Sequence, residues 1–333
     1  MNKYNLGFLG LSVLNKAAGE PLRLEILRVL AQDSYSVLEL CKILQHKQSG
    51  MSHHLKILAE AGLVAKRREG NTIFYSRALS NAGSALALLQ KQLYLTLDVI
   101  DISPEIVARL EQMKAVRVSQ SQKFFALQAD NFKERQDLIA EYPVYGDAVN
   151  ELLNKTLIDN YDCVIEVGPG AGDFLPVLAK QFLRVIALDS AAPMLNHAKS
   201  YCSDEHVNNV DFIEGDTQYL TQETVAADCI VMNMVLHHTP SPADIFMDVS
   251  GALKPNGALL VTELCRHDQD WAKESCGDLW LGFESEQLEQ WALLAGLKKV
   301  QSNYLALRNG FQIQLHQFYK CDVLSQGLNE SLS

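Results

Sequence analysis

The stretch CVIEVGPGAGDF, residues 163–174, constrains the fold of this chain more than any other. An apolar run of strand type reaches Glu166 and then opens into three alternate glycines, Gly168, Gly170 and Gly172. A strand, a glycine-rich turn and a helix in this order let the backbone approach a ligand closely and aim helix N–H groups at it. The spacing GxGxG differs from the GxGxxG of dinucleotide sites. It predicts a loop for an adenosyl ligand that has no pyrophosphate.

Strands and helices alternate after this loop. Apolar runs suited to strands, separated by helical or looped segments, lie near residues 162–167, 184–188, 210–213, 228–232 and 257–263. This alternation predicts a mostly parallel sheet with helices on both faces. Two further strands, 298–305 and 311–320, flank Asn309 and Gly310, which form a strong hairpin signal. A Rossmann-like, seven-stranded sheet closed by an antiparallel hairpin is the class I methyltransferase arrangement.

Acidic residues recur at the carboxyl ends of the first three of these strands. Asp189 can accept hydrogen bonds from both ribose hydroxyls, and Asp216 can accept one from the adenine amino group. Glu166 stands where the amino-acid end of the ligand would lie. The pattern predicts S-adenosylmethionine (SAM) or S-adenosylhomocysteine (SAH) as the ligand. The predicted contacts are Glu166, Gly168, Gly170, Gly172, Asp189, Ser190, Met194, Gly215, Asp216, Thr217 and Asn233.

The fourth strand leads into the loop NMVLHHTPSP, which contains His237 and His238. Similarity to methyltransferases places this loop beside the ligand sulfur. A general base there would help with some acceptors, but methyl transfer from a sulfonium needs mainly positioning and alignment. The two histidines are therefore candidates for catalysis, and no other catalytic residue is assigned.

The charge of the chain is unevenly distributed. Residues 1–100 contain 12 Lys and Arg against 7 Asp and Glu, whereas the remainder contains 17 against 33. A basic end on an acidic protein is typical of a DNA-reading module joined to a small-molecule domain.

The basic end has the pattern of a winged helix-turn-helix. A helix is predicted over Pro21–Leu30, with proline placed where a helix starts. Ser36 and Glu39 form a capping box that opens a short helix at 37–44. A second helix follows near 48–61.

The spacing of polar residues in the second helix predicts a face that contacts DNA. At 100° per residue, Met51, Leu55 and Leu58 face the core, and His54 lies at the edge of the buried stripe. Two strands at 64–68 and 72–77 then form a basic wing suited to phosphates. The predicted DNA contacts are Gln48, Ser49, Ser52, His53, Lys56, Arg67 and Arg68.

The segments PLRLEILRVL, VLELCKIL and QSGMSHHLKILAEAGLVAKRREGNTIFYSRA resemble the ArsR/SmtB family of bacterial repressors over about residues 8–100. The resemblance implies a homodimer on a palindromic operator, with the first helix and residues 80–100 packing across a two-fold axis. The family's metal chemistry does not carry over. Its thiolate sensors use two cysteines two residues apart, and here Cys41 is followed by Ile43. The last helix, 81–97, has no His or Asp for a zinc site. We therefore expect no metal.

The chain is expected to divide into four parts. Residues 1–100 form the DNA-binding and dimerisation domain, 101–153 a helical linker that covers the ligand pocket, 154–321 the SAM/SAH-binding domain, and 322–333 a tail. An alternative role for the linker is simple core packing by its aromatic residues.

The composition predicts a cytoplasmic protein. The seven cysteines are scattered and form no CxxC pair, so a disulfide framework or zinc ribbon is not expected. Lys3 precedes an apolar stretch at 6–14, but no small-x-small cleavage site follows it, so this stretch is interpreted as a first helix. No apolar run approaches the roughly 18 residues that a membrane span needs.

The combined chain resembles ArsR-type repressors fused to a methyltransferase-like domain, and the segment GDLWLGF at 277–283 is its most distinctive part. That group includes SAH-responsive regulators of the methionine and SAM cycle. The first hypothesis is accordingly a repressor with a SAH or SAM sensor. The second is a working SAM-dependent methyltransferase whose helix-turn-helix serves autoregulation. Its arsenite version would need Cys202, Cys265 and Cys276 to converge. An NAD enzyme is disfavoured by the GxGxG spacing and the terminal hairpin.

Overall fold

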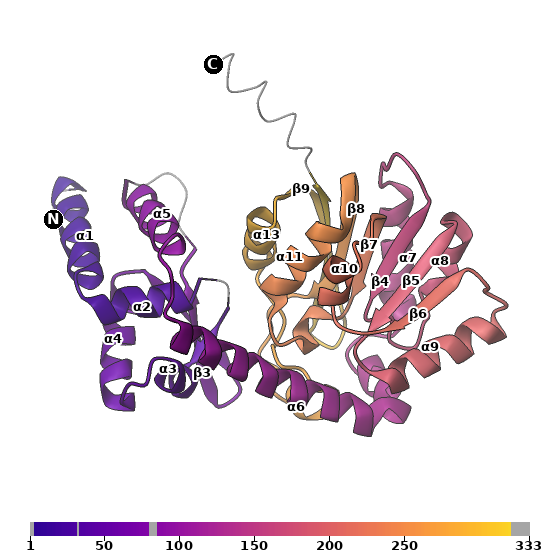
Figure 1. Cartoon of the computed structure of the whole chain (residues 1–333), viewed down its shortest axis with the longest axis horizontal. Coiled ribbons are helices and arrows are strands. Elements are labelled where there is room, and N and C mark those ends of the chain that lie inside the picture. Colours follow the sequence, from indigo (N-terminus) through magenta and orange to yellow (C-terminus); the bar gives the residue numbers. More distant parts are fainter. Residues whose placement is uncertain (1–2, 32, 80–84, 321–333) are drawn as a thin grey trace, which may run out of the picture. The chain divides into compact units, whose positions relative to one another are not determined.

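The computed structural model describes residues 3–31, 33–79 and 85–320, which form two compact units (Figure 1). The first unit ends at Arg117 and the second begins at Val118. The division therefore falls inside the segment expected as a linker, because helix α6 (Pro104–Asp137) begins in the first unit and ends in the second. The expected tail, 322–333, lies outside the described residues. Among the described helices, none is both long enough and apolar enough to cross a membrane.

The first unit is a winged helix-turn-helix, as predicted. Its helices are α1 (Lys3–Ala18), α2 (Pro21–Val29), α3 (Val37–Ile43), α4 (Gln48–Glu60) and α5 (Ala85–Asp98). Strands β2 (Val64–Glu69) and β3 (Thr72–Arg77) form the wing. Strand β1 (Tyr35–Ser36), which was not predicted, is two residues long and pairs antiparallel with β3. It is too short to show a period, yet it anchors the wing to the start of α3.

The predicted capping box is present at the start of α3. The Ser36 side chain accepts a hydrogen bond from the Glu39 backbone N–H, and the Glu39 carboxylate accepts one from the Ser36 N–H. The same carboxylate accepts two hydrogen bonds from the buried guanidinium of Arg117, at 2.9 and 3.0 Å. Arg117 also pairs with Asp33 at 3.3 Å. The first turns of α6 are thereby fixed to the helix-turn-helix.

The second unit is a seven-stranded sheet in the order β6-β5-β4-β7-β8-β10-β9. The strands are β4 (Cys163–Val167), β5 (Arg184–Asp189), β6 (Val210–Glu214), β7 (Ala227–Asn233), β8 (Leu253–Leu264), β9 (Leu297–Ala306) and β10 (Gln312–Lys320). Strands β4 to β8 pair in parallel, and β10 pairs antiparallel with both β8 and β9. The predicted fold class, with its terminal hairpin, is confirmed.

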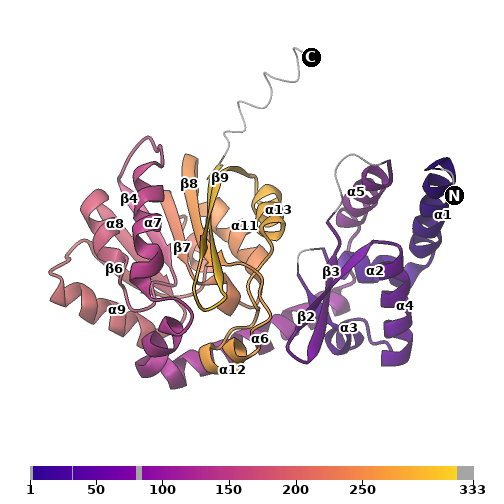
Figure 2. The same ribbon diagram turned by 180° about the vertical axis from the view of Figure 1, so that it is seen from behind.

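Helices cover both faces of this sheet (Figures 1 and 2). On one face, α7 (Tyr142–Asn154), α8 (Leu175–Gln181) and α9 (Ala192–Asp204) share a core with inward residues of β4, β5 and β7. On the other lie α10 (Gln218–Gln222), α11 (Pro242–Ala252) and α13 (Ser285–Leu294). There Phe246 of α11 contacts the rings of Trp291 and Phe318. Short helices η1 (Leu236–His238) and α12 (Trp271–Cys276) follow β7 and β8.

Candidate functional site

The glycine loop after β4 is built for close approach of a ligand. Gly168 and Gly172 have φ of 66° and 90°, a left-handed backbone that L side chains rarely adopt. A Cβ on Gly168 would lie 2.7 Å from Val235, and one on Gly172 would lie 2.9 Å from the Ala198 backbone. By contrast, a Cβ on Gly170, whose φ is 57°, would meet nothing within 4 Å. Gly170 therefore turns its open side away from the packed protein, where a ligand can approach.

Glu166 is fully enclosed behind this loop. Its Oε1 accepts a hydrogen bond from the side-chain amide of Asn233, at the end of β7, at 3.2 Å. Burial raises the pKa of Glu166 to about 8, against the opposing effect of that hydrogen bond. The carboxyl group therefore lacks a cationic partner among the described residues that would keep it ionised. A ligand ammonium would supply one.

Asp189 lies at the end of β5, as predicted. Its Oδ1 accepts a hydrogen bond from the Ala191 backbone N–H at 2.8 Å. Burial raises the pKa of Asp189 to about 6. Of its neighbours, Ser190 is exposed and Met194 is buried against Ala191. The carboxylate is therefore placed to accept further hydrogen bonds from a diol.

The residues after β6 that were predicted to bind the ligand already form hydrogen bonds within the protein. Asp216 is exposed, and its Oδ1 accepts a hydrogen bond from the Gln218 N–H at 3.0 Å. Gly215 donates its N–H to the carbonyl of Asp189. Thr217 is buried, and its hydroxyl lies 2.6 Å from Asp248 of α11. The hydroxyl of Thr217 is thus already paired, and the prediction that Thr217 contacts the ligand would have to be met by its backbone.

The second half of α6 packs against the loops that follow β4, β5 and β7. Phe125 contacts Met194 and Ala191 after β5, and its ring lies edge-on to His238 at 5.1 Å between centroids. The Ser121 hydroxyl donates to the His238 carbonyl at 3.1 Å. Lys133 pairs with Asp173 of the glycine loop at 2.7 Å. These contacts place α6 over the predicted ligand loops.

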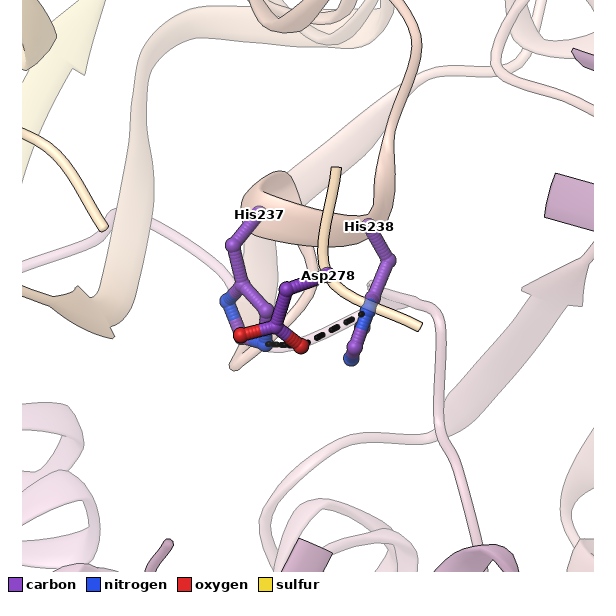
Figure 3. Close-up of side chains that lie close together, drawn as sticks. All are labelled: His237, His238 and Asp278. Atoms are coloured by element: carbon purple, nitrogen blue, oxygen red, sulfur yellow. Dashed lines mark ion pairs between the residues drawn. The ribbon is translucent and has the colours of Figure 1, made fainter. Parts of the chain in front are cut away.

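His237 and His238 belong to a buried polar cluster with Asp278 (Figure 3) and with a second carboxylate, Glu263. Nδ1 of His237 lies 2.5 Å from Oε1 of Glu263, at the end of β8. Oδ1 of Asp278 lies 4.0 Å from Nε2 of His237 and 3.5 Å from Nδ1 of His238. Sequence reasoning found both histidines but neither acid. The GDLWLGF segment was the only signal for Asp278.

The two imidazoles have opposite electrostatic environments. Burial lowers the pKa of His237, but the charges of Glu263 and Asp278 more than offset this and raise it to about 9. Burial and the neighbouring charge of His237 lower the pKa of His238 well below its ordinary value. His237 is therefore cationic and His238 neutral near pH 7, so His237 in this state is no base. Of the two imidazoles, His238 is the one that is neutral.

The predicted DNA-reading face of α4 is solvent-exposed. Met51, Leu55 and Leu58 are fully buried, as their spacing predicted. The outward residues Gln48, Ser49, Ser52, His53 and Lys56 are all exposed. His54 is half-buried, and its Nδ1 lies 3.5 Å from both Glu20 and Arg23. It is a packing residue, as its place at the edge of the stripe indicated.

The wing presents Arg68 but not Arg67. Arg68 is exposed and donates to the Gly70 carbonyl at 2.9 Å. Arg67 is buried and forms an ion pair with the buried carboxylate of Glu69. Consecutive residues of a strand point to opposite sides, so both arginines cannot face the same phosphate backbone. The prediction that Arg67 contacts DNA is therefore corrected.

The cysteines named for an arsenite site do not form one in the described part of the chain. Burial raises the pKa of Cys202 and of Cys265 to about 11 and that of Cys276 to about 12. Their thiols are therefore protonated near neutral pH. The ligand atoms of three metal-binding side chains converge only at His237, His238 and Asp278 among the described residues.

Two protein families match separate parts of the sequence. The family described as methyltransferase domain matches residues 132–302, half of the chain. The family of bacterial regulatory proteins of arsR type matches residues 20–66. The two matches fall on the sheet domain and on the winged helix-turn-helix.

Individual relatives match the same two regions. An uncharacterized HTH-type transcriptional regulator of Methanocaldococcus jannaschii is 46% identical over 61 residues, covering 18% of this chain and 68% of that protein. The ubiquinone biosynthesis O-methyltransferase of Coxiella burnetii is 24% identical over 166 residues, covering 45% of this chain and 70% of the enzyme. Among solved structures, the N-methyltransferase NodS of Bradyrhizobium japonicum in complex with SAH covers 61% of this chain and 100% of NodS, at 17% identity and a TM-score of 0.48. The chain belongs to the methyltransferase-domain family and carries, ahead of that domain, the helix-turn-helix of arsR-type bacterial regulators.

Proposed function

We propose that this protein is a transcriptional repressor whose methyltransferase domain binds SAH or SAM as an effector and thereby controls genes of the methionine and SAM cycle. The observation that carries the proposal is the presence, in one chain, of an exposed polar face on α4 and of two carboxyl groups beside the glycine loop, the buried Glu166 and the half-buried Asp189. The first is suited to DNA and the second to an adenosyl amino acid.

Each part of the ligand has a chemical counterpart in the domain. The ribose hydroxyls would donate to Asp189, and the ammonium group would offset the charge of Glu166 once it is ionised. Gly170 leaves room for the ligand to pass the loop, and Met194 offers an apolar surface beside Phe125. SAM and SAH share all of these groups, so this set accounts for binding either one.

Helix α6 supports an effector role over a purely catalytic one. Its Arg117 is fixed by Glu39 and Asp33 within the first unit, and its Ser121 and Phe125 contact His238 and Met194 within the second. A ligand that moves Phe125 therefore acts on a helix whose first turns belong to the DNA-binding unit. An effector shifts an equilibrium only through its differential affinity for two states, and α6 is the element proposed to differ between them.

The DNA-binding form is proposed to be a homodimer on a palindromic operator. Helices α1 and α5 lie beside each other, since a Cβ on Gly10 would lie 2.7 Å from Leu86. They leave large apolar side chains exposed, among them Phe8, Leu9, Leu88 and Leu95. A second copy would bury this surface, as a two-fold interface requires.

The second candidate function is SAM-dependent methylation of a small molecule. It is favoured by the cofactor motifs, which are kept in full, and by the similarity to an O-methyltransferase over 45% of this chain. In this case the neutral imidazole of His238 would be the candidate base. The arsenite version has the least support, because the thiols of Cys202, Cys265 and Cys276 are protonated and do not cluster in the described structure.

Isothermal titration with SAH and with SAM, run beside gel shifts on the gene's own upstream DNA, tests the proposal. We expect both ligands to bind and the protein to retard that DNA. Binding of either ligand without any DNA binding, together with product formation from SAM and candidate acceptors, would favour the enzyme.

A further inference from the structure

A set of metal-ligating atoms converges in the interior of the second unit, and the proposed effector function does not use it. One ring nitrogen of His237, one of His238 and a carboxylate oxygen of Asp278 all lie within 4.8 Å of one another (Figure 3). The exposed fractions of the three residues are 1%, 7% and 3%. Two imidazoles and one carboxylate form a donor set typical of divalent transition metals.

The spacing of the three atoms leaves room for an ion. Oδ1 of Asp278 is 4.0 Å from the His237 nitrogen and 3.5 Å from the His238 nitrogen. A point equidistant from three atoms separated in this way lies roughly 2.2–2.4 Å from each, close to ordinary metal–nitrogen and metal–oxygen bond lengths of about 2.0–2.2 Å. Small side-chain adjustments would complete the coordination.

A second carboxylate orients the first imidazole. Nδ1 of His237 lies 2.5 Å from Oε1 of Glu263, and the backbone N–H of His237 donates to Oε2 at 3.2 Å. A metal-ligating histidine characteristically donates its other ring N–H to a carboxylate, which fixes the ring and directs the remaining nitrogen at the metal. Glu263 does this here and points Nε2 of His237 at Asp278.

We propose that His237, His238 and Asp278 bind one divalent transition-metal ion, such as Zn²⁺, Mn²⁺, Fe²⁺ or Co²⁺, with Glu263 as the outer partner of His237. The cluster buries two carboxylates, Glu263 and Asp278, and a divalent cation held by neutral imidazoles would balance their charge. The proposal departs from the sequence-based expectation that the protein binds no metal. That expectation concerned Cys41 and the helix at 81–97, in the other unit.

The enclosed position indicates a structural ion. Asp278 belongs to the GDLWLGF segment. The two residues that follow it, Leu279 and Trp280, donate their backbone N–H groups to the His237 carbonyl at 2.8 and 3.1 Å. The Trp280 indole donates to the Thr239 carbonyl at 2.8 Å. A metal would join the same segment to the same loop through side chains. This assigns a role to the most distinctive part of the sequence that is independent of SAH, SAM and DNA.

The test is titration of the full-length, chelator-treated protein with Co²⁺, whose visible absorption reports its coordination. We expect one equivalent per chain to bind with the spectrum of a site of low coordination number, and Zn²⁺ to displace it. Asp278→Asn should weaken Co²⁺ binding by about 100-fold or more, and Glu263→Gln by about 10- to 100-fold, the usual effect of losing an outer partner.

A matched control tests whether exposed histidines, rather than the buried cluster, bind the Co²⁺. His46 and His206 are exposed, so the variant His46→Gln/His206→Asn should keep the Co²⁺ spectrum unchanged. The proposal is overturned if the wild-type protein binds no Co²⁺, if Asp278→Asn keeps the wild-type spectrum and affinity, or if the control variant loses them. Circular dichroism reports the fold of each variant. If Asp278→Asn does not fold, His238→Gln is judged by the same criteria.

Discussion

The side-chain amide of Asn233 donates a hydrogen bond to Oε1 of Glu166 at 3.2 Å, across the carboxyl ends of the neighbouring strands β7 and β4. Both side chains are buried. The single neutral donor lowers the pKa of Glu166, but burial dominates and leaves that pKa near 8. The carboxyl group of Glu166 is therefore mostly protonated near pH 7.

The stability of the ligand-free protein should consequently depend on Glu166 and pH. In the unfolded chain this carboxyl titrates near 4.5, and in the folded protein near 8. Between these values the folded state binds a proton that the unfolded state does not, so the free energy of unfolding contributed by Glu166 falls as the pH rises. Glu166→Gln should reduce that fall by on the order of 5 kcal/mol over the whole window, at about 1.4 kcal/mol per pKa unit, as measured by denaturant unfolding.

The control for this experiment is Glu205→Gln, which changes an exposed glutamate. Its pH dependence should match that of the wild-type protein. A Glu166→Gln profile parallel to the wild type would show that Glu166 is ionised in the folded state.

Asp189 should govern the affinity for both ligands. Asp189→Ala is expected to weaken SAM and SAH binding by roughly 2 kcal/mol or more, the scale for losing a charged hydrogen-bond acceptor. Because burial raises the pKa of Asp189 to about 6, wild-type affinity should also fall as the pH drops below that value, by about tenfold per pH unit. Calorimetric titration measures both effects. Asp204→Ala, at the exposed end of α9, is the matched control. Unchanged affinity in Asp189→Ala would remove this residue from the ribose site.

The two wing arginines should behave differently in DNA binding. Arg68→Ala should weaken binding similarly across sequences and lower the slope of log K against log salt by about 0.9, one phosphate contact. Arg67→Ala should leave the slope unchanged and instead lower the free energy of unfolding, because Glu69 loses a buried ionic partner. On α4, Ser52→Ala or His53→Ala should relax sequence preference. An equal loss of salt slope in both arginine variants would contradict the burial of Arg67.

The proposed dimer interface predicts an assembly defect. The exposed fractions of Phe8 on α1 and Leu88 on α5 are 74% and 72%. Phe8→Glu or Leu88→Glu should give monomers by light scattering and weaken operator binding, since a charge replaces apolar surface that a second copy would bury. Leu157→Glu changes an equally exposed leucine in the second unit, and it should leave the mass unchanged. If wild-type protein is monomeric at micromolar concentration, the interface assigned to α1 and α5 is wrong.

Features encoded over short stretches could be predicted from the sequence. The turn between β4 and α8 requires glycine at positive φ, and the buried face of α4 follows from the helical spacing of Met51, Leu55 and Leu58. The capping box of Ser36 and Glu39 spans four residues, so its hydrogen bonds were also predictable.

Features that depend on distant segments could not be predicted in the same way. Asp278 meets His237 and His238 only because the segment after α12 folds back onto η1, and no spacing rule reports such a contact. The hydroxyl of Thr217 is hydrogen-bonded to Asp248 of α11, which is another contact between residues distant in the sequence. Arg67 is different: strand alternation already required that it and Arg68 diverge, but only the fold determines which of them is buried.

The central claim is that the methyltransferase domain senses SAH and thereby controls DNA binding. SAM differs from SAH by one methyl group and one positive charge, and a small apolar group alone is typically worth about 1–3 kcal/mol of selectivity. The direction of preference rests on the resemblance to SAH-responsive regulators. The ligand must bind the free and DNA-bound forms unequally for any release to occur.

Fluorescence anisotropy of a preformed complex with labelled operator DNA, titrated separately with SAH and SAM, is the most direct test. The account predicts that SAH lowers the anisotropy to that of free DNA at a concentration at least about fivefold below that required of SAM. It also predicts that Asp189→Ala abolishes this response while binding DNA normally. Equal release by both ligands, or release by neither, would contradict the sensor function and favour the methyltransferase.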